Sequence, residues 1–133
     1  MIYIDTGAFL ARYLSRDQYH KQAKEFWQYL RKEGERCFTG NFVLDETFTL
    51  LARRAGYKFA VQRARNIFSS ERLTILRPDD EDEMKAIEFF DKYADQEISF
   101  TDCISFVLMR KEKLKRVFSF DGHFGLTGFK LCP

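Results

Sequence analysis

The chain has 133 residues, enough for one domain of ordinary size, and 45% of them are hydrophobic, including fifteen Phe and six Tyr. Charged residues make up 32%, and 22 basic side chains nearly balance 20 acidic ones, which gives a formal net charge of +2. This composition excludes an integral membrane protein and predicts a folded, soluble chain. The small net charge neither requires nor excludes a nucleic-acid partner.

Three cysteines, Cys37, Cys103 and Cys132, form no CxxC pair, and their odd number argues against a disulfide framework. Only His20 and His123 are available to complete a zinc site with them, so zinc is unsupported as well. We therefore expect reduced, buried cysteines in a cytoplasmic protein. The first residues lack the pattern of a signal peptide, and no apolar run approaches the ~18 residues that span a bilayer.

Short apolar runs rich in β-forming residues alternate with segments of helical periodicity along the whole chain. Strands are expected at residues 2–4, 36–39, 73–76 and 117–120, with an edge strand at 129–132. Helices are expected at about 8–14, from 17 to Gly34, at 41–54 with Asn41 as a cap, at 60–68, from 79 to about 94, and at 99–113. This alternation predicts one α/β domain over residues 1–133, with a mainly parallel sheet covered on both faces.

Two of these helices have apolar positions at helical spacing, which we expect to face the core. In the helix at 60–68 they are Ala60, Val61, Ala64, Ile67 and Phe68; in the helix that begins near 79 they are Met84, Ile87, Phe90 and Ala94. Acidic residues 79–83 stand at the start of the latter helix, where the macrodipole favours negative charge.

Four acids lie where strands end or helices begin. Asp5 follows the first strand and Asp121 follows the strand at 117–120, while Glu46 and Asp102 lie early in the helices that begin near 41 and 99. In a parallel sheet these positions face the carboxyl edge, where ligand sites gather. We therefore expect the four side chains to converge.

Carboxylates held together repel one another, and a bound divalent cation reverses that balance. Oxygen ligands suit Mg²⁺ or Mn²⁺, which orient a phosphodiester and help a bound water to attack it. The chain has neither a histidine-rich cluster nor a phosphate-binding glycine loop. Metal-assisted phosphate hydrolysis is therefore the chemistry that the pattern favours.

Each acid also has an ordinary structural explanation. Asp5 is followed by Thr-Gly and fits a turn with a helix cap, and Asp121 is followed by Gly, as in many turns. Asp102 stands three residues after Ser99 and fits a capping pattern. Glu46 shares a helical face with Arg53 and fits a solvated surface acid.

Four segments in order resemble the PIN-domain family, and within it the VapC-type ribonuclease toxins of toxin–antitoxin pairs. The segments are IYIDTGA at 2–8, NFVLDET at 41–47, ISFTDC at 98–103 and FSFDGHF at 118–124. Each segment is degenerate alone, but their order and spacing cover essentially the whole chain. The resemblance implies an α/β/α sandwich and an endoribonuclease that depends on Mg²⁺ or Mn²⁺.

The resemblance also implies roles for single residues. Asp5 and Asp102 would be the central metal ligands with Asp121 beside them, and Glu46 would bind a second metal or position the water. Thr6 would support the site through hydrogen bonds. Some relatives carry an acid where this chain has His123, which leaves the number of metals open; His123 would touch substrate phosphate or, as we favour, pack at the rim.

Family resemblance further implies a homodimer, an RNA substrate and a cognate antitoxin that inserts a basic side chain into the acidic cleft. The aromatic segments 19–30 and 57–68 offer partner surface, although such stripes are more often core. Basic residues at 53–54, 63–65 and 110–116 either steer RNA to the site or are solvated helix ends.

Three other functions fit parts of the pattern. A PIN nuclease that processes RNA or DNA outside any toxin pair has the same acids. A receiver-like phosphoacceptor also binds Mg²⁺, but it needs an acidic pair after the first strand and an acid on a central strand, and residues 73–77 carry none. An inactive RNA-binding PIN module would normally have lost one of the four acids.

Overall fold

The computed structural model describes residues 1–133 and contains one five-stranded sheet in the order β3-β2-β1-β4-β5, with every neighbouring pair parallel. The strands are β1 (Ile2–Ile4), β2 (Cys37–Gly40), β3 (Leu73–Leu76), β4 (Arg116–Phe118) and β5 (Lys130–Cys132). The predicted parallel sheet is confirmed. Its order also differs from the 2-1-3-4-5 order of receiver domains, which removes that alternative.

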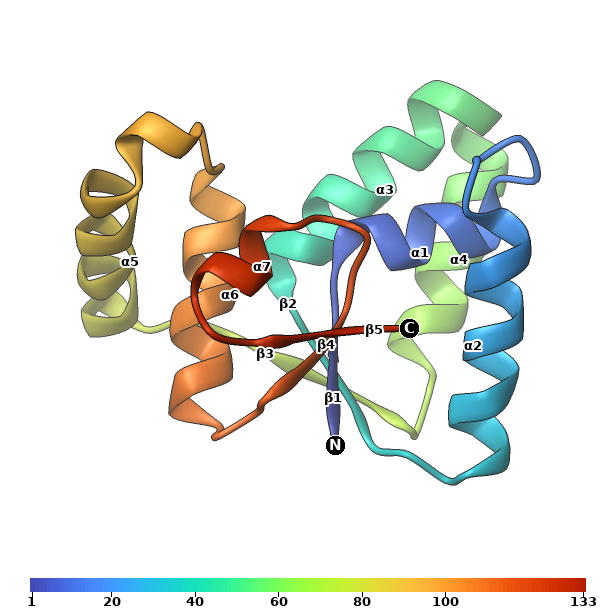
Figure 1. Cartoon of the computed structure of the whole chain (residues 1–133). Coiled ribbons are helices and arrows are strands. Elements are labelled where there is room, and N and C mark those ends of the chain that lie inside the picture. Colours follow the sequence, from blue (N-terminus) through green and yellow to red (C-terminus); the bar gives the residue numbers. More distant parts are fainter.

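Helices cover both faces of this sheet (Figure 1), which confirms the predicted α/β/α architecture. They are α1 (Thr6–Tyr13), α2 (His20–Lys32), α3 (Asn41–Ala55), α4 (Tyr57–Phe68), α5 (Asp80–Lys92), α6 (Phe100–Lys111) and α7 (His123–Leu126), with a short 3₁₀ helix, η1 (Ala94–Gln96). In Figure 1, α1, α2 and α4 lie on one side of the strands and α5 and α6 on the other. Helix α3 contacts α1, α4 and α6, so it joins the two layers at one edge of the sheet.

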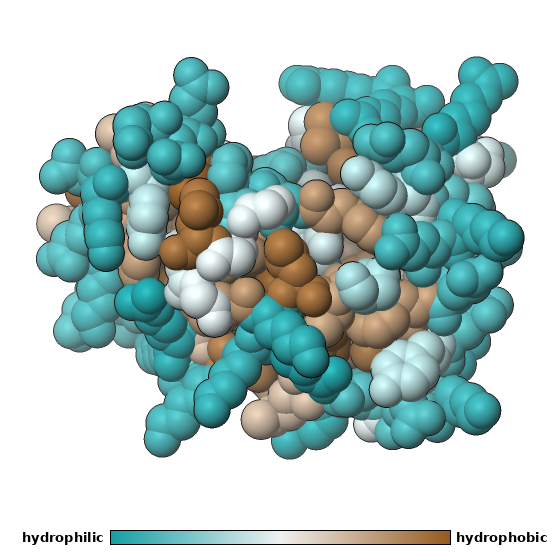
Figure 2. Space-filling view, viewed as in Figure 1, coloured by the Kyte–Doolittle hydropathy of each residue, from teal (hydrophilic) through white to brown (hydrophobic).

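The central strand β1 lies at the middle of the core. Ile2, Tyr3 and Ile4 are completely buried, because helices pack on both of its faces. On the neighbouring strand, Phe118 is buried against Phe26 and Trp27 of α2, with ring centroids 4.7 and 5.3 Å away. Figure 2 shows hydrophilic side chains around the margin of one face and apolar ones at its centre, over α7 and β5.

Gly40 explains the sharp passage from β2 to α3. A Cβ atom at this position would lie 2.7 Å from the Tyr3 hydroxyl and 3.1 Å from Leu108 Cδ1, so only glycine allows this close approach. Gly40 is also the N-cap of α3, and no side chain caps this end. The predicted cap at Asn41 is wrong, because the chain turns one residue earlier and Asn41 is already helical.

The buried face predicted for α5 is wrong. Met84, Ile87 and Phe90 are 62%, 48% and 48% exposed, and Ala94 lies beyond the helix in η1. The face toward α6 instead carries Asp82, Ala86, Phe89 and Tyr93. The prediction for α4 is partly wrong as well: Ala60 and Ile67 are buried, but Val61 and Phe68 are 48% and 55% exposed.

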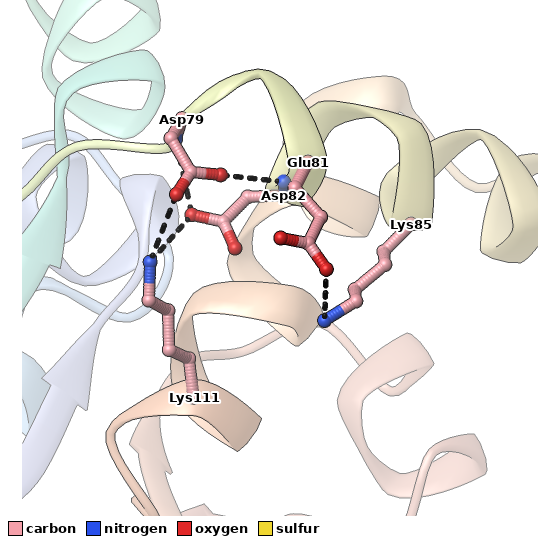
Figure 3. A network of polar contacts seen from close by, with 5 residues as sticks. All are labelled: Asp79, Glu81, Asp82, Lys85 and Lys111. Carbon is pink, nitrogen blue, oxygen red and sulfur yellow. Dashed lines mark hydrogen bonds and ion pairs between the residues drawn. The ribbon is translucent and has the colours of Figure 1, made fainter.

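A buried acid, Asp82, holds the start of α5 in place (Figure 3). Asp79 and Asp82 form a capping box, in which each carboxylate accepts a hydrogen bond from the other residue's backbone N–H, at 2.8 and 3.0 Å. Lys111 Nζ, at the end of α6, lies 3.0 Å from Asp82 Oδ2 and 3.5 Å from Asp79 Oδ2. These contacts supply the hydrogen bonds and the charge that a buried carboxylate needs.

All three cysteines are free and buried, as predicted. Among the helices, none is both long and apolar enough to cross a membrane.

Candidate active site

A pocket of about 430 Å³ contains all four predicted acids. Asp5 comes from the end of β1, Glu46 from the second turn of α3, Asp102 from the first turn of α6 and Asp121 from the segment after β4. The structure therefore brings together side chains that are up to 116 positions apart in the sequence (5 to 121). Their convergence was predicted; their chemical roles stay predictions.

The pocket lies where the order of the strands reverses. From β1 the chain builds outward through β2 to β3, and then returns to the other side of β1 to form β4 and β5. The helices that follow β1 and β4 leave a crevice at such a point, beyond the carboxyl ends of the two strands. Asp5 and Asp121 follow these two strands.

Asp5 is buried, with 5% of its surface exposed, and its Oδ2 accepts a hydrogen bond of 2.8 Å from the Ser119 hydroxyl. Burial and the charge of Asp102 raise the pKa of Asp5 to about 7, against the lowering effect of the Ser119 hydrogen bond. Asp5 stands at the N-cap position of α1, but its side chain makes no capping hydrogen bond. The explanation of Asp5 as a simple helix cap is therefore wrong.

Asp102 is 8% exposed, and its pKa is also raised to about 7, first by burial and then by the charges of Asp121 and Glu46. Ser99 caps α6 by accepting a 3.1 Å hydrogen bond from the Asp102 N–H. The capping pattern is thus real, but it uses the backbone of Asp102 and leaves the carboxylate to the pocket.

Asp121 and His123 complete the acidic group. Asp121 Oδ1 accepts a 2.9 Å hydrogen bond from the His123 N–H, so the predicted turn exists. The His123 ring turns back over it, with Nδ1 3.1 Å from Asp121 Oδ1 and 3.6 Å from Asp102 Oδ2. Asp102, Asp121 and His123 each place one possible metal-ligand atom so that the three atoms lie within 4.8 Å of one another. His123 thus faces the acids, and its contact with substrate phosphate or its place at the rim stays a prediction.

Ser119 is a site residue that the sequence did not reveal. Its hydroxyl donates to Asp5 and accepts a 3.0 Å hydrogen bond from the Asp121 N–H, so one side chain fixes two acids. The buried hydroxyl of Thr6 lines the pocket without a hydrogen-bond partner, and Thr6 acts on Asp5 only through its backbone. Two further acids, Asp17 and Glu97, also line the pocket and were not predicted. For Ser119, the only signal in the sequence was its position two residues before Asp121, at the end of a strand.

Neither lysine nor arginine lines the pocket. Of the predicted clusters, the one at 110–116 ends where β4 begins, at the edge of the sheet opposite the pocket. Arg116 there forms an ion pair with Glu35. The cluster is therefore not positioned to guide RNA into the crevice directly.

The donor chemistry of the pocket fits a divalent cation. Two carboxylic groups with raised pKa values lie beside a third acid and an imidazole whose buried Nδ1 makes no hydrogen bond. Without a counter-charge this arrangement opposes ionisation, and a hard cation removes the opposition.

Comparison with known proteins agrees with this geometry. The PIN-domain family matches residues 2–130. The chain is 35% identical over 132 residues to the 23S rRNA-specific endonuclease VapC20 of Mycobacterium tuberculosis, covering 97% of this chain and 95% of the relative. It is 36% identical over 127 residues to a VapC ribonuclease of Archaeoglobus fulgidus, covering 92% and 78% respectively.

Solved structures give the same result. The crystal structure of M. tuberculosis VapC20, described as a sarcin–ricin loop cleaving toxin, superposes with a TM-score of 0.88 at 33% identity, covering 97% of this chain and 96% of that one. DNA-bound VapBC of Salmonella typhimurium has a TM-score of 0.70 at 11% identity, over 99% and 98% of the two chains, and this likeness supports the fold alone. The parallel sheet with an acidic crevice at its switch point, together with these relatives, defines the class of PIN-fold ribonucleases. The chain belongs to the PIN-domain family, and VapC ribonucleases are its relatives.

Proposed function

We propose that the protein is an endoribonuclease that hydrolyses RNA phosphodiester bonds with Mg²⁺ or Mn²⁺. The observation that carries this proposal is the convergence of Asp5, Glu46, Asp102 and Asp121 in one crevice, with the pKa values of Asp5 and Asp102 raised to about 7. Groups tuned in this way are typical of catalytic sites. Kinship with VapC ribonucleases supports the choice of RNA.

Asp5, Asp102 and Asp121 would hold the cation, and Glu46 would hold a second one or position the attacking water. A bound divalent cation supplies positive charge to the phosphate oxygens and lowers the pKa of a coordinated water. The chain itself supplies orientation. Ser119 fixes Asp5 and the backbone of Asp121, and His123 lies beside Asp121, where it can contact a phosphate or complete the ligand set.

Cleavage assays on purified protein test this proposal. We expect RNA to be cut with Mn²⁺ or Mg²⁺ and cutting to stop with EDTA. Asp5→Asn and Asp102→Asn keep the side-chain shape but remove ligand charge. Each should lower cleavage by more than the roughly 10- to 100-fold typical of changes at residues that only orient metal ligands. Asp45→Asn, at an exposed neighbour of Glu46, is the matched control and should cut normally. Undiminished cleavage by both acid variants would refute the assignment.

The relatives suggest a substrate. Because VapC20 is named for 23S rRNA and for cleavage of the sarcin–ricin loop, we propose a structured loop of 23S rRNA as the target of this chain too. Sequencing of RNA ends after expression in cells checks this directly. A single dominant cut in 23S rRNA supports the proposal, and cuts confined to other RNAs exclude it.

A second pocket is a candidate surface for an antitoxin. About 480 Å³ in volume, it lies between α1, α2 and α4 and against β2 and β3, and the segments 19–30 and 57–68 form part of its lining. Five basic residues and three aromatic ones line it: Arg12, Lys24, Arg31, Arg63, Arg72, Phe9, Tyr13 and Trp27. Arg12 stacks over Trp27 at 4.7 Å, and the buried Nε of Arg63 has no hydrogen-bond partner. An amphipathic segment with acidic side chains fits this lining.

We propose that the protein is the toxin of a toxin–antitoxin pair and that its antitoxin, probed as the product of a short adjacent gene, occupies this basic groove. Arg12→Glu and Arg63→Glu should each weaken that complex by at least about tenfold without affecting cleavage by the free enzyme. Growth arrest on expression, relieved by the adjacent gene, tests the pairing itself. Cleavage without growth arrest would favour a processing nuclease without an antitoxin.

The exposed apolar face of α5 is the surface we propose for a homodimer. Met84, Ile87 and Phe90 lie on consecutive turns, and Phe100 packs edge-on against Phe90 at 5.5 Å. A surface of this kind on a folded protein commonly marks an interface. Light scattering should give twice the chain mass, and Ile87→Glu should give the monomer.

We expect the protein to act in the cytoplasm, where its three thiols stay reduced.

A further inference from the structure

Two aromatic rings form one wall of the acidic pocket. Tyr19 lies in the segment between α1 and α2, and Phe120 lies just after β4; both line the pocket together with the four acids. Their ring centroids are 4.3 Å apart and their planes differ by 1°, so the rings are fully stacked. Tyr19 is nevertheless 37% exposed. Phe120 covers one ring face, so the other face is the one available to a further aromatic partner.

Each ring belongs to a short segment that also carries an acid of the pocket. Phe120 stands between Ser119, which binds Asp5, and Asp121, and its ring meets the buried Phe118 edge-on at 6.0 Å. The Tyr19 N–H donates a 2.8 Å hydrogen bond to Asp17 Oδ1, immediately before α2 begins at His20. The pair is therefore a fixed surface at a defined position relative to the carboxylates.

The charge of the pocket makes such a surface useful. Its fourteen lining residues include six acids (Asp5, Asp17, Glu46, Glu97, Asp102 and Asp121) and neither Lys nor Arg. An RNA strand gains no direct ion pairs there and is repelled wherever a cation does not intervene. Contacts that carry no charge are therefore well suited to bind the nucleotides beside the reacting phosphate. Stacking of a base on an aromatic ring is such a contact, and it accepts any base because every base has a π-face.

We propose that the exposed face of Tyr19, backed by Phe120, is a stacking platform for an unpaired nucleobase next to the scissile phosphate. The proposal rests on the nuclease function proposed above and adds the part of the substrate that the site selects. A base inside a duplex is already stacked on both faces and cannot lie on the ring, so the platform favours loops and single strands over paired RNA. The alternative is that Tyr19 only shields Phe120 from water.

Three substitutions separate these roles. Tyr19→Phe keeps the stacking ring, Tyr19→Leu keeps an apolar cover over Phe120 without a π-face, and Tyr19→Ala removes both. Tyr29→Leu is the matched control, since Tyr29 is a 48% exposed tyrosine that stacks on Phe26 and lines neither pocket. The kinetic probe is a synthetic RNA hairpin with the sarcin–ricin loop sequence, cut in Mn²⁺. The binding probe is a short single-stranded RNA that contains 2-aminopurine, whose fluorescence falls on stacking. Binding is measured in Ca²⁺, and the RNA is checked afterwards to be uncut.

With the hairpin, we expect Tyr19→Leu and Tyr19→Ala to raise KM roughly 5- to 150-fold, the effect of one base stack, while kcat changes less. Tyr19→Phe and Tyr29→Leu should behave as the wild type. Fluorescence quenching of the single-stranded probe should be lost in Tyr19→Leu and kept in Tyr19→Phe. Melting temperature and Mn²⁺ affinity should not change in Tyr19→Leu, whereas a purely structural role would move these and leave KM alone.

Wild-type KM and quenching in Tyr19→Leu would overturn the platform while leaving the nuclease function intact. Quenching by a wild-type protein that cuts no RNA would show the converse, a platform without the proposed activity. If the wild type quenches no 2-aminopurine in any position along the probe, the platform is excluded whatever the cleavage result.

Discussion

Ser119 is the residue on which the geometry of the acidic group most depends. Its hydroxyl donates a hydrogen bond to Asp5 Oδ2 and accepts one from the Asp121 N–H, so its removal frees the Asp5 carboxylate and the Asp121 backbone at once. Residues that orient metal ligands typically contribute 10- to 100-fold to affinity. We expect Ser119→Ala to lower Mn²⁺ affinity by about that factor, as measured by calorimetric titration and by the metal dependence of cleavage.

Ser105→Ala is the control for this substitution. The Ser105 hydroxyl is equally buried and pairs with the Tyr3 hydroxyl at 2.9 Å, so its loss costs stability of about 1 kcal/mol but no metal affinity. Equal Mn²⁺ affinities in the two serine variants would contradict the positioning role of Ser119.

The four acids could be predicted from the sequence, but the residues that hold them in position could not. Asp5, Glu46, Asp102 and Asp121 each follow a strand or begin a helix, a position that the sequence shows. A hydrogen bond between Ser119 and Asp5 spans 114 positions and depends on the pairing of β1 with β4, which no local pattern contains. The family resemblance predicts support from Thr6, which directly follows Asp5, but the Thr6 hydroxyl has no hydrogen-bond partner.

At the scale of the element, the start of α5 is set by its capping box. Asp79→Ala removes the acceptor for the Asp82 N–H and one partner of Lys111, and loss of such a cap typically costs about 1 kcal/mol. We expect this decrease in the free energy of unfolding from urea denaturation, with RNA cleavage unchanged. Glu81→Ala, in the same turn, removes only an exposed pair with Lys85 at 3.7 Å and should change stability by less than roughly 0.5 kcal/mol. A larger effect at Glu81 than at Asp79 would exclude the capping explanation.

The same helix shows why its buried face was predicted wrongly. Helix α5 has apolar side chains on two faces, and periodicity alone favoured Met84, Ile87 and Phe90. The face that packs on α6 includes Asp82, an acid that any hydropathy pattern assigns to solvent. Only the contacts of Asp82 with its own helix end and with Lys111 make its burial tolerable, and these come from tertiary structure.

The strands were easier to predict, because the fully buried strand β1 forms an unbroken run of β-forming residues between polar ends. Strand β4 ends at Phe118, two residues before its predicted end at 120. The Ser119 N–H still bonds to the Cys132 carbonyl of β5, while Phe120 lines the pocket. Departure from regular structure at this point is therefore part of the site. The order of the strands could be limited to a few parallel arrangements but not chosen from the sequence.

For the whole molecule, the crevice couples metal binding to folding. The pKa values of Asp5 and Asp102 are raised to about 7 in the folded protein, above the ordinary value near 4. The folded state therefore binds more protons than the unfolded state between these two values. This contribution to stability is complete below about pH 4 and is lost as the pH rises through 7.

In EDTA, the free energy of unfolding should consequently fall between pH 5 and pH 8, by about 2–4 kcal/mol for the two coupled acids together. Asp5→Asn cannot ionise at this position, so it should flatten the profile and be more stable than the wild type at pH 8. Mn²⁺ binds the ionised carboxylates, so the stabilisation it gives should be larger at pH 8 than at pH 5, reaching about 2.7 kcal/mol at a concentration 100 times its Kd. Urea denaturation at both pH values, with and without Mn²⁺, measures all three effects. A free energy of unfolding in EDTA that rises from pH 5 to pH 8, or a Mn²⁺ effect that is equal at both pH values, would contradict the raised pKa values of Asp5 and Asp102.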